Sequence, residues 1–130
     1  MEGCVVTDLK VHSQHNCYRL SPGEMQAIQD RGVSVTLEPG THIVKIREGH
    51  VSQGADVKTQ VEPFVLLWIY GGKVINKKTN VEVVATWVSL NGYDDALVMD
   101  VVETATLCAF FFDTAPNDND GELTLSVVRI

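Results

Sequence analysis

Hydrophobic and polar residues alternate along most of the chain with a period of two, which predicts β-strands. The segment VSVTL at 33–37 places its two valines and its leucine on one face, and THIVKIR at 41–47 alternates in the same way. Glu38-Pro39-Gly40 lies between them. Two alternating segments joined by Pro-Gly predict a β-hairpin.

Further segments have the composition of strands. FVLLWIY at 64–70 is apolar at both parities, as a central strand covered on both faces would be. Asn91-Gly92 is a strong turn signal between two of the others. The remaining predicted strands are 81–90, 96–103, 106–113 and 122–130, and GCVVTDLKV at 3–11 is a candidate for one more.

One helix is predicted, at 21–30. Ser21 is a suitable N-cap, Pro22 suits the first helical position, and Glu24 completes a capping box. Gly32 is a suitable stop. Short strands with turn signals and one short helix near the N-terminus predict a single all-β domain over residues 1–130, an antiparallel β-sandwich or jelly roll.

Composition narrows the possible functions. The 130 residues carry a formal net charge of −7, which opposes binding to nucleic acids and anionic membranes and favours a cation or a basic partner. No apolar run reaches the roughly 18 residues of a membrane span, and MEGCVVTDLK lacks the features of a secretory signal. An odd number of cysteines (Cys4, Cys17 and Cys108) then favours a reducing compartment, so we expect cytoplasmic localisation and free, mostly buried thiols.

The segment FFFDTAPNDNDGELTLSV raises the main functional question. Five acids and amides fall within the eight residues 113–120. Their oxygens are the ligands that a hard cation such as Ca²⁺ prefers, and a cation would offset the repulsion among the carboxylates. An EF-hand is excluded, because aligning Gly121 with that loop's glycine puts Pro116 and Val127 at ligand positions. A solvated turn is the alternative, since Asp, Asn and Gly are ordinary turn residues.

The same segment resembles the C-terminal signature of the calcium-dependent galactophilic lectins of the PA-I type. In that signature an apolar strand ends in Asp, and a short loop, Asn-Asn, small-Gly-small and an alternating strand follow. PGTHIVKIREGHVSQG at 39–54 and PFVLLWIYGG at 63–72 resemble two further segments of the family, in the same order. The resemblance implies a galactose-binding-like β-sandwich that binds Ca²⁺ and forms a homo-oligomer.

The resemblance also implies a set of calcium ligands. The Asp that ends the apolar strand matches Asp113, and the Asn-Asn pair matches Asp118 and Asn119. A threonine ligand of the family falls near Asn117, in a loop that is shorter here, and a main-chain carbonyl ligand matches Gln53. An Asp in place of Asn at 118 adds negative charge, which is compatible with Ca²⁺.

Carbohydrate binding carries over less completely. The lectins have an insertion before the next core strand whose side chains hold the hexose, whereas only ADVKTQVEP at 55–63 spans that gap here. Asp56 and Gln60 are candidates to hydrogen-bond hydroxyls, and His50 replaces an aromatic residue next to the corner. Galactose specificity is therefore not implied.

Other residues give weaker signals. His12, His15 and Cys17 are of the types that bind zinc, but the spacing H-x-x-H-x-C matches no closed site, and a polar loop is the alternative. Asp94-Asp95 is a candidate carboxylate pair for glycoside chemistry, but adjacent strand residues point to opposite faces, so a turn is expected.

The two tryptophans and the absence of catalytic motifs complete the picture. Trp68 and Trp87 lie in apolar strands and are expected in the core, with stacking on a sugar as the alternative. The chain has no nucleophile-elbow, P-loop, dinucleotide-binding or H-E-x-x-H motif, so an enzyme is not expected. The sequence favours a calcium-binding, lectin-like module for a carbohydrate or other polyhydroxy ligand. The alternative is a structural or assembly subunit without a metal site.

Overall fold

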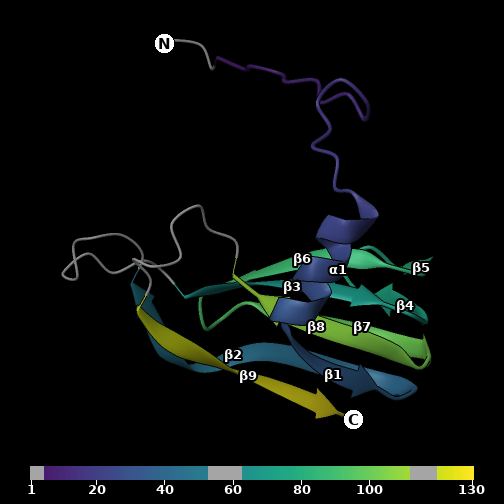
Figure 1. The fold of residues 1–130 in the computed structure, drawn as a ribbon, viewed down its shortest axis with the longest axis vertical. Helices are drawn as coiled ribbons and strands as arrows, with labels where there is room; N and C mark the ends of the chain where they lie inside the picture. The colour runs from purple at the N-terminus through teal and green to yellow at the C-terminus, as the bar shows by residue number, and fades with distance from the viewer. Residues whose placement is uncertain (1–4, 53–62, 112–119) are drawn as a thin grey trace.

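The computed structural model describes residues 5–52, 63–111 and 120–130. Within them the chain forms one helix and two antiparallel sheets that pack face to face (Figure 1). The elements are α1 (Pro22–Arg31), β1 (Val33–Leu37), β2 (Gly40–Ser52), β3 (Phe64–Tyr70), β4 (Lys73–Asn76), β5 (Val81–Val83), β6 (Thr86–Asn91), β7 (Ala96–Glu103), β8 (Ala105–Phe110) and β9 (Asp120–Arg129).

The sheets are of nearly equal size. The four-stranded sheet has the order β1-β8-β3-β6, and the five-stranded sheet has the order β5-β4-β7-β2-β9. Every strand pair is antiparallel. The structure therefore confirms the predicted antiparallel β-sandwich with one short helix near the N-terminus.

The helix α1 forms for the local reasons that the sequence indicates. The Ser21 hydroxyl accepts a hydrogen bond from the Glu24 N–H, and the Glu24 carboxylate accepts one from the Ser21 N–H, which completes the capping box. The Gly32 N–H donates to the Ile28 carbonyl and ends the helix in extended backbone. No helix among the described residues is long and apolar enough to cross a membrane.

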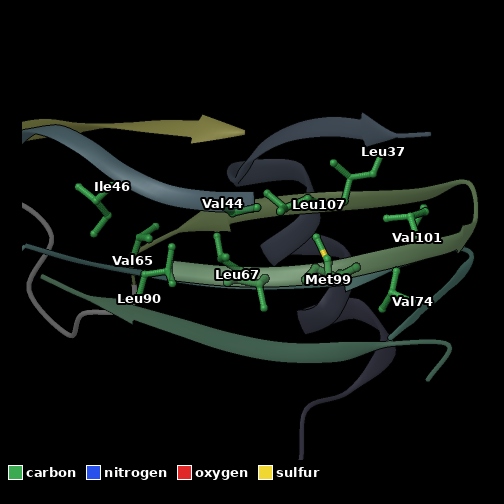
Figure 2. Close-up of a cluster of buried hydrophobic side chains, with 13 residues drawn as sticks. Leu37, Val44, Ile46, Val65, Leu67, Val74, Leu90, Met99, Val101 and Leu107 are labelled. Carbon is green, nitrogen blue, oxygen red and sulfur yellow. The ribbon is translucent and has the colours of Figure 1, made fainter. Parts of the chain in front are cut away.

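The core lies between the sheets. Strand β3 alternates between buried and half-buried residues along its whole length, so its buried side chains face the second sheet. Figure 2 shows this cluster, with Leu67 and Met99 near its centre. Each large buried side chain contributes on the order of 1.5–3 kcal/mol relative to exposure. Among the described residues, the largest fully buried side chains are Leu37, Val44, Ile46, Leu67, Ile69, Val74, Leu90, Leu97, Met99, Leu107 and Cys108.

The predicted hairpin of 33–37 with 41–47 is wrong. Strand β1 pairs with β8 in one sheet, and β2 pairs with β7 and β9 in the other. The segment between them is a corner that carries the chain from one sheet to the other, with Gly40 at φ 140°. Alternation determines which face of a strand is buried, but not which strand becomes its neighbour.

The predicted strand 81–90 also changes sheets. It is divided into β5, in the five-stranded sheet, and β6, in the four-stranded sheet. Strand β4 was not predicted, because Gly71-Gly72 reads as the end of a strand rather than a short connection between two. The turn at Asn91-Gly92 is confirmed, but it joins strands of different sheets. Residues 5–11 of the candidate N-terminal strand are not in a strand.

Candidate functional site

Two chain segments that contain predicted ligands lead from one sheet to the other at one end of the sandwich. The first leads from β2 to β3, and the second leads from β8 to β9. Ser52, the last described residue before the first crossing, is the register partner of Asp120, the first described residue after the second. One boundary of each crossing therefore lies on two neighbouring strands, at the same end of the five-stranded sheet.

The other two boundaries lie together in the four-stranded sheet. Leu66 of β3 is the register partner of Phe110 of β8. The rings of Phe64 and Phe111 meet edge to face, with centroids 5.8 Å apart. Both crossings thus begin and end at the same end of the sandwich. We call this region, bounded by Ser52, Phe64, Phe111 and Asp120, the crossover end.

Two of the predicted calcium ligands are next to these boundaries in the sequence. Gln53 comes after Ser52, and Asn119 comes before Asp120. His50 lies in β2, where its register partner is Glu122. Gln53 and Asn119 themselves lie outside the described residues. So do the remaining predicted metal ligands and ligand-binding residues, which are Asp56, Gln60, Asp113, Asn117 and Asp118. Among the described residues, no cluster of three or more metal-binding side chains is present.

The turn between β6 and β7 lies at the same end. Asn91 is the register partner of Phe64, and the Gly92 N–H donates to the Pro63 carbonyl. The Asp95 carboxylate accepts the Asn91 N–H at 3.0 Å and lies 3.5 Å from the Lys78 Nζ. These partners lower the pKa of Asp95, the hydrogen bond from Asn91 more than the charge of Lys78. The expectation that Asp94-Asp95 is part of a turn is confirmed.

The group of residues at 12–17 forms a polar turn. The His12 Nδ1 accepts hydrogen bonds from the N–H groups of Gln14 and His15, and the His12 and His15 rings stack 4.2 Å apart. Both described cysteines are free thiols; Cys17 is exposed and Cys108 is buried, and Cys4 lies outside the described residues. With its Nδ1 already bonded to main-chain amides, His12 serves the turn, as the alternative reading of this segment expected.

An aromatic cluster lies on the outer face of the four-stranded sheet. The ring centroids of Trp68 and Trp87 are 4.5 Å apart, and Tyr70 and Phe110 extend the cluster on either side. Trp87 is 45% exposed, so the expectation that it belongs to the core is wrong. Trp68 is half-buried, and among the described residues its Nε1 has no hydrogen-bond partner. The side chains of Trp68, Tyr70 and Trp87 alternate with core residues along β3 and β6, which places them on the opposite face.

A large apolar cleft opens at one side of the sandwich, between the edge strands β1 and β9. Its volume is about 850 Å³, and its walls include Val33 and Val35 of β1 and, on β9, the inward side chains Leu123, Leu125 and Val127. The sequence places Val33, Val35 and Leu37 on one face, but it does not show that the first two lack a cover. That information depends on which strands are neighbours, and it is absent from local alternation.

Comparisons of the chain with protein-family models, with curated proteins and with solved structures found no match. The fold assignment therefore depends on the sheets themselves. The likeness to the galactophilic lectins depends on the three sequence segments described above.

Proposed function

We propose that the chain is a calcium-binding, lectin-like module that recognises a carbohydrate or other polyhydroxy ligand at the crossover end. The single observation that supports this function best is the pairing of Ser52 with Asp120. It brings together the boundaries of two segments that are distant in the sequence, and these segments contain all the proposed calcium ligands. A site built from both segments requires this proximity.

The donor chemistry fits the proposed ion. Asp113 and Asp118 offer carboxylates, Asn117 and Asn119 offer amide oxygens, and Gln53 offers a main-chain carbonyl. Ca²⁺ takes six to eight oxygen ligands of these kinds, whereas zinc prefers nitrogen and sulfur. The fold supports such a site by holding the ends of both segments on paired strands, which lowers the entropic cost of ordering the loops between them.

The mechanism is binding without catalysis. Bound Ca²⁺ would supply open coordination positions for two vicinal hydroxyls of the ligand. The carboxylates of Asp113 and Asp118 bring negative charge to the site, while His50, Asp56 and Gln60 are the candidates to orient the ligand by hydrogen bonds.

Cytoplasmic localisation stays a prediction from the cysteine content.

Isothermal titration with Ca²⁺ tests the metal site. We expect about one site per chain, with uptake lost in Asp113→Ala and Asn119→Ala because each change removes an oxygen ligand. Asp94→Ala is the matched control, since it removes an exposed carboxylate from the turn at the same end without touching the proposed ligands. Circular dichroism should show that all three variants fold. Absence of uptake at millimolar Ca²⁺ would contradict the proposal.

A glycan array, run with and without EDTA, tests the ligand class. We expect glycan binding that disappears with EDTA and returns when Ca²⁺ is added in excess. Glycan binding that persists in EDTA would contradict recognition through the metal. If Ca²⁺ binds but no glycan does, the metal site remains and the carbohydrate proposal is wrong.

A second candidate, a structural or assembly subunit, is favoured by a different observation. Within the described residues, the cleft between β1 and β9 leaves Val33 and Val35 exposed and the facing apolar side chains of β9 only partly buried. Monomeric proteins rarely leave large contiguous apolar surface exposed unless it binds something. The calcium titration separates these two candidates, because only the first requires a metal site.

A further inference from the structure

Strand β1 is an edge strand whose inner face is mostly uncovered. On the described part of the chain its only neighbour is β8, so its other edge has unpaired main-chain groups. Along its inner face the exposed fraction is 77% for Val33, 43% for Val35 and 1% for Leu37. The sequence VSVTL contains neither the charges nor the proline that usually protect a free edge.

The opposite wall of the cleft is also apolar. Leu123, Leu125 and Val127 of β9 pack against the core on one side and remain only partly buried. The four-stranded sheet ends at β1 opposite a five-stranded sheet. One more strand on the free edge of β1 would cover the exposed valines and bring the two sheets to equal size.

The N-terminal arm, defined here as residues 5–11, has the pattern of such a strand. Val5, Thr7, Leu9 and Val11 share one parity, and Val6, Asp8 and Lys10 share the other. In the single chain the arm is not in a strand, and Leu9 is 84% exposed. An extended segment of seven residues is about 23 Å long, enough to run beside all five residues of β1.

The position of the arm favours a second copy as the acceptor. Helix α1 leads into β1 through Gly32, and the arm precedes the other end of the helix. Figure 1 shows the arm, drawn in purple, extending beyond α1 and away from its own sandwich. On the part of the chain that the structure describes, the arm therefore does not cover the cleft of its own copy and extends outward. Exchange of an identical element between two copies is a common route to a symmetric dimer.

We propose that residues 5–11 of one copy form a fifth strand on the free edge of β1 in a second copy, with reciprocal exchange in a two-fold dimer. The side chains of Val5, Leu9 and Val11 fill the cleft between β1 and β9, while Asp8 and Lys10 face solvent. The main-chain groups of the arm pair with those of β1, which removes the free edge. The inference is independent of the calcium site.

Sedimentation velocity and native mass spectrometry of the full chain test the exchange. At about 0.15 M salt, which screens the negative charges of the two copies beyond roughly 8 Å, we expect a dimer. Leu9→Asp should raise the dimer dissociation constant at least about tenfold, because it places a charge in an apolar cleft. Val6→Asp is the matched control: it introduces the same charge at an exposed valine of the opposite parity and should leave the constant within about threefold.

A mixing experiment identifies the acceptor. Val35→Asp damages the cleft but leaves the arm intact, whereas Leu9→Asp damages the arm but leaves the cleft intact. Neither variant alone should form the dimer, and the mixture should recover a heterodimer with one intact arm-cleft contact. Insertion of the arm into its own chain predicts no recovery, and that result would overturn the proposal.

Hydrogen exchange keeps the test decisive if Val35→Asp does not fold. The β1 amides that point to its free edge, away from β8, should exchange at least about tenfold faster in Leu9→Asp than in the parent chain or in Val6→Asp, since that edge is then open to water. A monomeric parent chain, or equal effects of Leu9→Asp and Val6→Asp, would overturn the exchange. Neither result bears on Ca²⁺ uptake, so failure here and failure of the calcium site are distinguishable.

Discussion

The closed interior of the sandwich and its open side, between β1 and β9, are built from the same kind of sequence. Leu37 and Val33 lie on the same face of one strand, yet Leu37 is 1% exposed and Val33 is 77% exposed. Leu37 is opposite Ala105 and belongs to the core cluster, whereas Val33 lines the open cleft. The difference comes from what covers each end of the strand and not from the strand itself. An alternating segment indicates that one face of the strand is to be buried. It does not indicate which part of which chain covers that face.

The largest expected effect separates the two ends of β1. Leu37→Ala should lower the free energy of unfolding by about 2–5 kcal/mol, because it removes a fully buried side chain and leaves a cavity. Val33→Ala should cost less than about 0.5 kcal/mol when it is made in the Leu9→Asp background, where the cleft is expected to be empty. Urea denaturation of both variants at low protein concentration measures the two costs.

The same pair of substitutions also tests whether the open side is covered in the parent chain. With the arm intact and at a protein concentration above the dimer dissociation constant, Val33→Ala should cost more than in the Leu9→Asp background. Equal costs in both backgrounds would mean that nothing covers Val33. A small cost for Leu37→Ala would remove the distinction between the two ends.

An intermediate effect is expected on the other face of the same strand region. Gly32 joins α1 to β1, and a Cβ at this position would lie 2.2 Å from the Cys108 Sγ and 3.1 Å from the Ala109 carbonyl oxygen. Its backbone is extended, so Gly32→Ala adds crowding without backbone strain. We expect a loss of about 1–3 kcal/mol from overpacking, measured by urea denaturation.

Gly23 provides the matched control for this substitution. It lies in the first turn of α1, where a Cβ would meet only the Ser21 hydroxyl at 4.0 Å. Gly23→Ala should leave the stability unchanged or raise it by up to about 1 kcal/mol, since alanine is the better helix former. Equal losses of unfolding free energy for Gly23→Ala and Gly32→Ala would show that the contact between α1 and β8 is not tightly packed.

The sequence predicts local structure here better than it predicts strand neighbours. Strands 33–37, 64–70 and 96–103 are found with the predicted bounds. The capping box at Ser21 and Glu24 requires only residues three apart, and it too is found. Corners between sheets are harder to predict. Pro-Gly and Asn-Gly are typical turn residues both where the two flanking strands pair in one sheet and where they belong to different sheets, as at Pro39-Gly40 and Asn91-Gly92.

For the candidate site, the sequence supplies only the chemistry. The acids and amides of 113–120 are of the types that a hard cation binds, with a solvated turn as the alternative, whereas the pairing of Ser52 with Asp120 depends on the long-range pairing of β2 with β9. The β1–β9 cleft could not be read from one strand, because its walls come from both sheets. The feature of the sequence that bears on the cleft is the alternation of residues 5–11. These residues have the pattern of a strand but pair with no strand in the single chain.

The smallest expected effect concerns the side of the sandwich opposite the cleft. There the turn between β4 and β5 forms one ion pair with β7, Lys77 with Asp100 at 3.2 Å, and one with the turn before β7, Lys78 with Asp95 at 3.5 Å. The carboxylate of Asp95 also accepts the Asn91 N–H, and the pKa of Asp95 is lowered in the folded chain. A lowered pKa stabilises the fold at pH values above the ordinary value of 3.8, and this contribution is lost as the pH falls through the folded-state value.

Asp95→Asn should therefore reduce the free energy of unfolding at pH 7 by only about 0.2–1 kcal/mol, because the ion pair is close to solvent. The amide oxygen of asparagine can still accept the Asn91 N–H, so the substitution removes the charge and keeps the hydrogen bond. Below about pH 4 the difference in unfolding free energy between variant and parent should shrink, since the carboxylate of Asp95 becomes protonated there and loses its charge. Urea denaturation across the acid range measures this difference. If the difference in unfolding free energy between variant and parent stays constant with pH, the charge of Asp95 does not stabilise this side of the sandwich. Packing alone would then distinguish it from the open side between β1 and β9.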